Sequence, residues 1–294
     1  MTISYQTFPL KIRVPMLQER VSDDIHVFTS ERYAQVTASL VVTPAGGILV
    51  DTLPFPDETR EIAEFAARRC PGGIRYVVLT HYHADHTYGA YLFPQAEVVA
   101  HRLCRERLIT LGVPALAKAK EETPELAEVE LRFPDLVFDE GELYLHLGGK
   151  TLRLFATPGH TMDSIAVHVM EENILLAADA MMPVPTIMDG DLEAMLQSLR
   201  TLQQQRFESI VQGHGEVLLR GEIPIRLEAN IRYLETIRDL VQEALAEGRP
   251  RESLRSTSIE DCGLSRIPLN GLVQQLHVAN LMALYERMAQ PQRV

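Results

Sequence analysis

The chain has 294 residues, enough for one large domain or two small ones with a substantial core. Its hydrophobic share of 46% and charged share of 23% are those of a globular protein, and its net charge is −12. Nine acidic residues and one arginine lie between Glu121 and Glu142, so this surface repels polyanions and no nucleic-acid partner is expected.

The first part of the chain is predicted to begin with a β-meander. Residues 1–24, broken by Pro9 and Pro15, are expected to be irregular. A helix that starts at Pro56 with acidic residues in its first turn should end before Pro71. The elements expected here are strands at 25–28, 36–42 and 48–51, a helix at 56–69, a strand at 76–79, a short helix near 88–93 and a strand at 97–100.

Residues 102–135 are predicted to be helical and polar, with interruptions at Pro114, Pro124 and Pro134 and no strand before Leu136. We interpret 102–142 as an insertion that covers the functional site, because such insertions often form lids. An ordinary surface excursion packed on its own helices is the alternative. The apolar side chains that would face the pocket are Leu108, Ile109, Leu111, Val113 and Leu116.

The remaining elements complete a two-sheet architecture. They are strands at 143–147, 152–156, 165–170 and 174–178, a helix at 191–205, a last strand at 209–212, a helix from 223 onward and a final helix at about 269–289. This order indicates an α+β fold, an αββα sandwich with two mixed β-sheets packed face to face and helices outside. We assign residues 1–220 to the sandwich and 221–294 to a C-terminal helical extension packed on it.

A dense cluster of potential metal ligands follows one short apolar strand. Residues 81–86, HYHADH, hold three histidines and one aspartate. In extended chain His81 and His83 point the same way, and a turn would bring Asp85 and His86 to the same space. Imidazole and carboxylate ligands suit zinc, and also iron or manganese. A solvated histidine-rich loop rarely has this density, so the motif predicts a metal site.

Three further ligand-type residues occur where predicted strands end. His160 lies in TPGHT, Asp179 follows an apolar strand, and His214 stands between two glycines. Loops at strand ends, held by a rigid sheet, are where binding residues are expected. We therefore predict that the metal site lies at the strand-end edge of the sandwich.

The motifs THYHADH, TPGHT, AADA and GHG resemble, in type and order, those of the metallo-β-lactamase superfamily of metallohydrolases, over roughly residues 25–215. The αβ/βα sandwich of that family agrees with the element order. The resemblance implies one metal at His81, His83 and His160, a second at Asp85, His86 and His214, and Asp179 as a bridge between them. It also makes Asp51 the aspartate that supports the metal loop, although an ordinary turn or cap residue fits the sequence equally well.

The chemistry of such a site is hydrolysis. Two metal ions about 3.5–4 Å apart share a water and lower its pKa toward about 7, which makes hydroxide available at neutral pH. They also polarise a substrate oxygen, while Asp85 would orient the nucleophile or pass a proton to the leaving group. We predict a binuclear hydrolase with two Zn2+ ions, or Fe or Mn, acting on an ester, thioester or lactone of a small, partly apolar molecule.

The family resemblance leaves other reactions open. True β-lactamases of the family carry Cys or Ser where this chain has Asp179, which resembles the thioesterase, lactonase and phosphodiesterase branches. Phosphodiesterase or β-lactamase activity is therefore a lesser alternative. Sulfur dioxygenases of the family bind one iron with the equivalents of His81, His160 and Asp179, which leaves a persulfide dioxygenase open. A metal-binding protein without catalysis is a third reading.

Other features concern the pocket, partners and location. Met162, Met181, Met182 and Met188 follow the ligands and would form either a soft pocket wall or core filler. The C-terminal helices could close the pocket or join two copies of the chain as a homodimer. The three cysteines are far apart, which is typical of reduced thiols, and no signal peptide or membrane-spanning segment is found. We expect a cytoplasmic protein whose partner is a small-molecule substrate.

Overall fold

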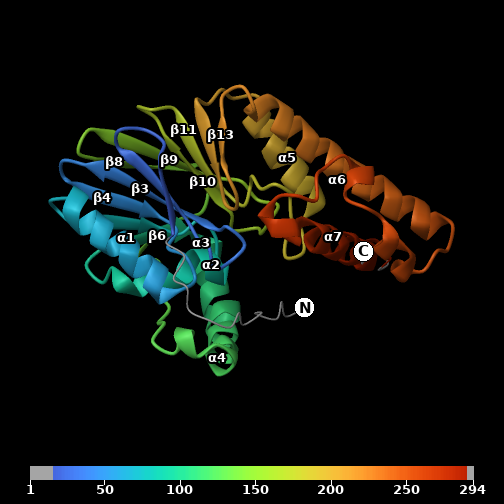
Figure 1. The fold of residues 1–294 in the computed structure, drawn as a ribbon, viewed down its shortest axis with the longest axis horizontal. Coiled ribbons are helices and arrows are strands. Elements are labelled where there is room, and N and C mark those ends of the chain that lie inside the picture. The colour runs from blue at the N-terminus through green and yellow to red at the C-terminus, as the bar shows by residue number, and fades with distance from the viewer. Residues whose placement is uncertain (1–15, 290–294) are drawn as a thin grey trace.

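Two β-sheets form the centre of the computed structural model, which describes residues 16–289 (Figure 1). Both sheets are mixed, with parallel and antiparallel pairs. The first has the order β1-β2-β3-β4-β5-β6-β7: Leu17–Arg20, Ile25–Thr29, Thr37–Thr43, Gly46–Val50, Ile74–Val78, Glu97–His101 and Leu136–Phe138. The second has the order β13-β12-β11-β10-β9-β8: Val217–Leu219, Ser209–Gln212, Ile174–Ala178, Ile165–Val169, Lys150–Ala156 and Glu142–Leu147.

Helices cover both outer faces of this sandwich. The α-helices are α1 (Pro56–Arg69), α2 (Ala84–Thr87), α3 (Arg102–Arg107), α4 (Val113–Glu122), α5 (Leu192–Gln203), α6 (Ile223–Ala246) and α7 (Leu272–Ala289). The short 3-10 helices are Tyr88–Leu92, Pro124–Leu126, Arg251–Ser256, Glu260–Cys262 and Leu269–Gly271. Within residues 16–289, no helix combines the length and apolarity needed to cross a membrane.

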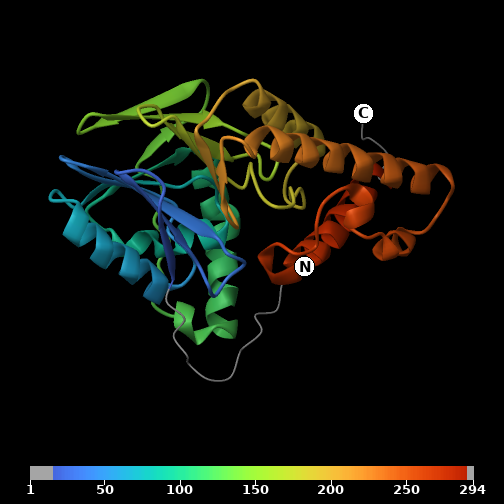
Figure 2. The ribbon, with the colours of Figure 1, turned by 45° about the horizontal axis from the view of Figure 1, so that its top comes forward.

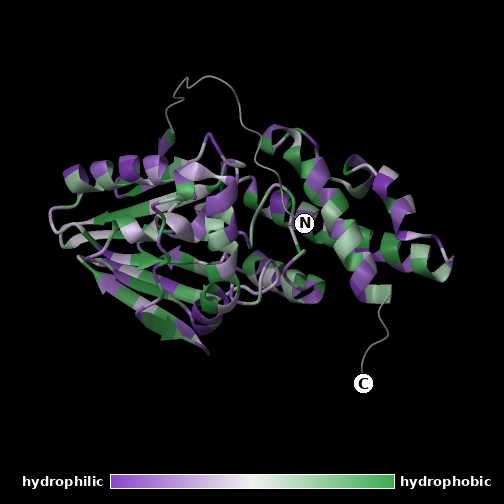
Figure 3. Ribbon diagram, turned by 90° about the horizontal axis from the view of Figure 1, so that it is seen from below, coloured by the Kyte–Doolittle hydropathy of each residue, from purple (hydrophilic) through white to green (hydrophobic). Residues whose placement is uncertain are grey.

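The layers are held by three apolar clusters. Facing side chains of the two sheets interdigitate, for example Val41 and Val78 with Leu154 and Val167. α1 packs on the outer face of the first sheet through Ile62. α5 covers the second sheet, α6 packs on α5, and α7 packs on α6 (Figures 1 and 2). Figure 3 shows hydrophobic colour on many strands and alternating hydrophobic and hydrophilic colour along the helices, as amphipathic helices require. The predicted αββα sandwich is confirmed.

Helix α1 shows why the sequence pattern worked well here. It covers Pro56–Arg69, the predicted residues, with Asp57 and Glu58 in the first turn and Arg68 in the last. Two short strands were missed, because they are polar or only three residues long. β1 lies within the stretch predicted to be irregular, of which residues 1–15 fall outside the described residues, and β13 follows the strand predicted to be the last.

The segment 102–142 differs from its prediction in two respects. The predicted interruption at Pro114 is absent, since α3 runs through a π-helical turn, Leu108–Gly112, directly into α4. A proline in a helix removes one hydrogen bond and crowds the carbonyl four residues earlier, which the wider π turn accommodates. Helical structure ends at Leu126, so 127–135 is a loop rather than a helix.

Candidate metal centre

All the predicted ligands meet at one edge of the sandwich. They lie in the loops that follow β5, β9, β11 and β12, and the carboxyl ends of parallel neighbours reach the same edge. An isolated bridge pairs Val36 with His214 and so connects the two sheets at this point. Side chains far apart in sequence are thereby brought together by the ends of the strands.

The first donor group is His81, His83, His160 and Asp179, with one donor atom of each within 4.8 Å of the others. His83 Nδ1 lies 3.1 Å from His81 Nε2 and 2.9 Å from His160 Nε2. His160 Nε2 is also 3.2 Å from Asp179 Oδ2. Three ring nitrogens that converge in this way fit ligands around a shared cation.

The second donor group is Asp85, His86 and His214, again within 4.8 Å of one another. Asp85 Oδ2 lies 3.4 Å from His214 Nε2 and 3.8 Å from His86 Nε2. Both rings are buried, whereas the Asp85 side chain keeps 15% of its surface exposed. Asp85 is therefore the member of this group that solvent or a substrate reaches.

Asp179 lies between the two groups. Its Oδ2 is 3.2 Å from His160 Nε2 and 3.6 Å from His214 Nε2, and its Oδ1 is 3.3 Å from His86 Nε2. One carboxylate thus contacts histidines of both groups. This is the position that the sequence motif led us to expect of a bridging ligand.

The loop 181–190 orients two rings of the first group. His160 Nδ1 contacts Thr186 Oγ1 at 2.7 Å and the Thr186 carbonyl at 3.0 Å. His83 Nε2 lies 3.2 Å from Asp189 Oδ2. Such partners fix which ring nitrogen is free to bind a metal. They leave Nε2 of His160 and Nδ1 of His83 for the site.

Asp51 supports both groups from the end of β4. Its Oδ1 accepts from the Thr80 backbone N–H at 2.9 Å, and its Oδ2 accepts from the Thr80 hydroxyl at 2.8 Å. The same Oδ2 lies 2.8 Å from His86 Nδ1, while Thr80 Oγ1 lies 3.1 Å from His81 Nδ1. Asp51 therefore sits in the position proposed for it, beneath the metal loop.

The backbone conformation sets the direction of the Asp179 and His214 side chains. β11 has a register shift between Leu176 and Ala178, and Ala178 has a φ of 45°. A bulge of this kind redirects the next side chain, here Asp179. A Cβ at Gly213 would lie 1.9 Å from Asp179 Oδ1, so only glycine fits beside it. His214, the next residue, lies with its Nδ1 2.9 Å from the Ala34 carbonyl.

The two groups differ in their electrostatics. Burial lowers the pKa of His160 to about 4 and that of His81 well below its usual value. In the second group burial has the same direction, but Asp179 and other carboxylates raise the pKa of His214 to about 10 and that of His86 well above normal. The carboxylates of this edge thus stabilise positive charge in the second group.

Two buried donor atoms fit a metal ion. His86 Nε2 and Asp179 Oδ1 are buried and make no hydrogen bond, although the two atoms lie 3.3 Å apart. Buried polar atoms normally have partners, and leaving one unpaired costs about 1–3 kcal/mol. A divalent cation would satisfy both atoms, and the imidazole and carboxylate donors are those that zinc, iron and manganese accept. The residues present therefore fit the implied metal.

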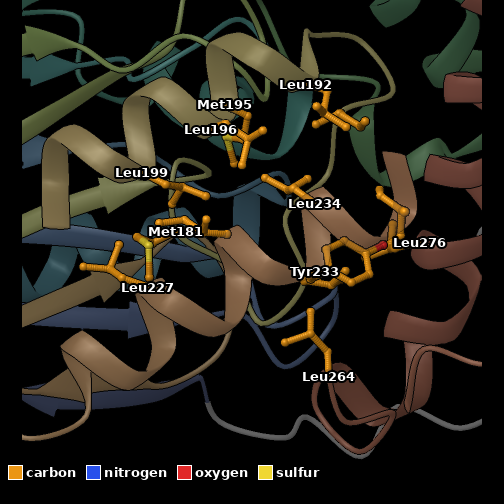
Figure 4. Close-up of a cluster of buried hydrophobic side chains, with 14 of the residues drawn as sticks. Met181, Leu192, Met195, Leu196, Leu199, Leu227, Tyr233, Leu234, Leu264 and Leu276 are labelled. Atoms are coloured by element: carbon orange, nitrogen blue, oxygen red, sulfur yellow. The ribbon is translucent and has the colours of Figure 1, made fainter. Parts of the chain in front are cut away.

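The methionines and the 102–142 segment contribute less to the site than the histidines do. Met181 and Met182 are buried, Met181 packs among the α5 and α6 side chains (Figure 4), and Met188 is partly buried against the same cluster. Met162 is exposed, with 41% of its surface accessible. Of the apolar residues expected to face the pocket, Leu108 and Leu116 are buried in clusters, whereas Ile109, Leu111 and Val113 are about half exposed.

Sequence reasoning missed several supporting residues. Thr186 and Asp189 lie in a loop without a motif, and only contacts reveal them. Asp163 is different, because a carboxylate three residues after His160 was a usable signal. It is fully buried, and its Oδ2 accepts from the Tyr82 N–H at 2.8 Å, which ties the turn of His160 to the first ligand loop.

Comparisons with known proteins agree with this geometry. The model of the metallo-beta-lactamase superfamily matches residues 32–222. Beta-lactamase-like protein 2 homolog of Caenorhabditis elegans is 30% identical over 61% of this chain and 55% of its own length. An atrochrysone carboxyl ACP thioesterase of Pseudocercospora fijiensis is 25% identical over 69% of this chain and 54% of its own. The chain thus spans just over half the length of both relatives.

Among solved structures, a metallo-beta-lactamase family protein from Thermus thermophilus superposes with a TM-score of 0.68 and 20% identity. The match covers 92% of this chain and 94% of the other. At this identity the likeness concerns the fold. It extends over nearly the whole chain.

Proposed function

The chain belongs to the metallo-beta-lactamase superfamily, and we propose that it is a hydrolase that holds two divalent metal ions, zinc in the first instance. The proposed substrate is an ester, thioester or lactone of a small, partly apolar molecule. One relative is named as an acyl-carrier-protein thioesterase, which supports an acyl substrate.

The observation that carries this proposal is the place of Asp179. Its carboxylate lies within 3.6 Å of His160, His214 and His86, which belong to different donor groups. Two separate sets of donors that share one carboxylate are what a pair of neighbouring ions needs. A single ion in the first group would leave the buried His86 Nε2 with only the Asp179 and Asp85 carboxylates, 3.3 and 3.8 Å away.

Bound divalent ions would supply an activated water and a polarised substrate oxygen. The protein supplies position and charge around them. Burial raises the pKa of Asp85, but His86 and His214 outweigh this effect and lower the pKa to about 2. The side chain is therefore ionised at neutral pH. An ionised, partly exposed carboxylate in this position would accept a hydrogen bond from a water molecule and so orient it for attack. We assign this role to Asp85.

Metal analysis together with activity tests the proposal. Protein produced without added metal should contain close to two zinc ions per chain. It should hydrolyse p-nitrophenyl acetate and acyl thioesters, and lose both activities on removal of metal by a chelator. One iron per chain with oxygen consumption on a glutathione persulfide would instead support the dioxygenase. Failure to bind any divalent metal would overturn both.

A further inference from the structure

The loop 181–190 is tied to the C-terminal extension along its whole length. Asn230 of α6 donates to the Met182 carbonyl at 3.0 Å, at the start of the loop. The hydrogen bonds from this extension to the rest of the loop come from α7. Both α6 and α7 lie beyond residue 222, where the family match ends. This loop also carries Thr186 and Asp189, the partners of His160 and His83.

Asn280 clamps the half of the loop that holds Thr186. Its Nδ2 donates to the Pro185 carbonyl at 2.7 Å, and its Oδ1 accepts from the Ile187 N–H at 3.0 Å. These two groups flank Thr186 on either side. Asn280 is fully buried, and its Nδ2 also lies 3.1 Å from the hydroxyl of Tyr233 on α6, so the amide is held in one orientation (Tyr233 is shown in Figure 4).

Arg287 clamps the half that holds Asp189. Its guanidinium donates to the carbonyls of Ile187 at 2.6 Å and Gly190 at 2.8 Å, and also to that of Met188. These carbonyls lie on both sides of Asp189. Arg287 follows Asn280 by seven residues, or about two helical turns, so both side chains leave the same face of α7.

We propose that Asn280 and Arg287 are positioning residues of the metal centre. α7 carries no predicted ligand, yet through these two side chains it sets the loop that orients His160 and His83. The rings of the second group do not depend on it, because Asp51 and the Ala34 carbonyl hold them. The inference rests on the proposed function, since it concerns the same metal ions.

A merely structural role makes a different prediction. α7 also buries Leu276 and Leu281 in the large cluster under the second sheet, so its loss would destabilise the whole protein. Tyr285 provides the matched control within the same helix, because its hydroxyl donates to the Arg249 carbonyl at 2.8 Å, away from the ligand loop. Tyr285→Phe removes one hydrogen bond of similar geometry with no link to a ligand.

The test compares Asn280→Ala, Arg287→Ala and Tyr285→Phe in the full chain. Zinc is titrated against a chromophoric chelator, the visible spectrum of the cobalt-substituted protein is recorded, and urea unfolding measures stability. In Asn280→Ala and Arg287→Ala, one zinc ion should bind about tenfold more weakly, at the lower end of the usual effect of a supporting partner, while the other is unchanged. The cobalt spectrum should shift. Tyr285→Phe should leave both unchanged, and Arg287→Lys should recover part of the lost affinity.

Two results would overturn the inference. The first is wild-type zinc affinity and cobalt spectrum in Arg287→Ala, which lies partly at the surface and is expected to fold even where Asn280→Ala does not. The second is an equal loss at both ions that follows the loss of stability in all three variants. Wild-type protein that binds no zinc would instead remove the proposed function itself, so the two failures are distinct.

Discussion

The two donor groups meet at Asp179, but different segments orient most of their rings; His81 alone in the first group shares the support of Asp51, through Thr80. The rings of His83 and His160 are oriented by the loop 181–190, which depends on α7. The rings of His86 and His214 are oriented by Asp51 and Ala34, which belong to the first sheet and its loops. A change in one of these segments should therefore reach one group before the other.

The two donor groups also differ in the pKa values of their histidines. The low pKa of His160 leaves its ring neutral, which is the form that binds a metal. The pKa of His214 is raised, so its ring must lose a proton before it can bind a metal ion. His81 and His160 are therefore neutral before an ion binds, whereas His86 and His214 exchange a proton for an ion.

The largest loss of metal affinity is expected at Asp179, the carboxylate that the two donor groups share. Asp179→Ala should weaken both sites together and abolish hydrolysis, because Asp179 contacts histidines of both groups. The loss in affinity should exceed the roughly 100-fold typical of a supporting partner. Titration with zinc measures both sites, and one tight site left intact would contradict bridging.

A ligand that belongs to only one donor group should affect only the ion of that group. His83→Ala and His214→Ala should each abolish hydrolysis, each with the loss of a different ion, while circular dichroism stays that of the wild type. The sheets persist because neither ring belongs to the apolar clusters between the layers. Wild-type turnover of p-nitrophenyl acetate by either purified variant would contradict the assignment of the site.

The sequence predicted which side chains converge at this edge better than it predicted the contacts that support them. The HYHADH motif and the strand ends are local signals, so the order of the sandwich and the side chains that converge could be inferred. Thr186, Asp189 and Arg287 act through contacts between segments up to about 100 residues apart, which no local pattern encodes. The sequence also predicts a final helix, but no pattern in it indicates that Asn280 holds the loop 181–190.

The support of the first group should also respond to acid. His277 of α7 is fully buried beside Tyr233, with 3.0 Å between its Nδ1 and the tyrosine hydroxyl. Burial lowers its pKa to about 4, although the carboxylates of Glu260 and Asp261 oppose this. The unfolded chain takes up the proton near pH 6.5, so this residue favours unfolding as the pH falls from about 6.5 to 4, by roughly 2–3 kcal/mol.

Urea unfolding of metal-free protein at pH 7.5, 6 and 5 measures this loss. The contribution of His277 should be full at pH 7.5 and decline toward pH 5. The other buried histidines titrate in both the wild type and the variant, so the comparison of the two isolates His277. His277→Gln, which keeps a hydrogen-bonding group for Tyr233, should decline less over the same range. Parallel curves for the two proteins would show that the buried histidine does not cause the loss.

The smallest effect is expected from the segment that touches neither group of ligands directly. Within 102–142, Arg107 reaches the surroundings of the ligands: its guanidinium carbon lies 5.3 Å from the centre of the Tyr82 ring, and its Nε lies 3.6 Å from Asp163 Oδ1. We proposed this segment as a cover with Leu111 and Leu116 toward the pocket. Their exposures of 48% and 7% now give the two residues separate roles. Leu116 packs with Phe55 and Tyr88, so Leu116→Ala should cost stability.

The substitution Leu111→Ala tests whether the segment 102–142 covers the substrate. If the exposed face of this segment contacts the substrate, KM for a long-chain p-nitrophenyl ester should rise about fivefold, or about 1 kcal/mol, and KM for the acetate ester should stay the same. Metal content should be unchanged, because the ligands and their supports lie elsewhere. The exposed side chain Ile225 at the start of α6 provides the control, since Ile225→Ala removes a similar apolar surface outside the segment. Equal effects of Leu111→Ala and Ile225→Ala on long and short esters would mean that the segment is only surface.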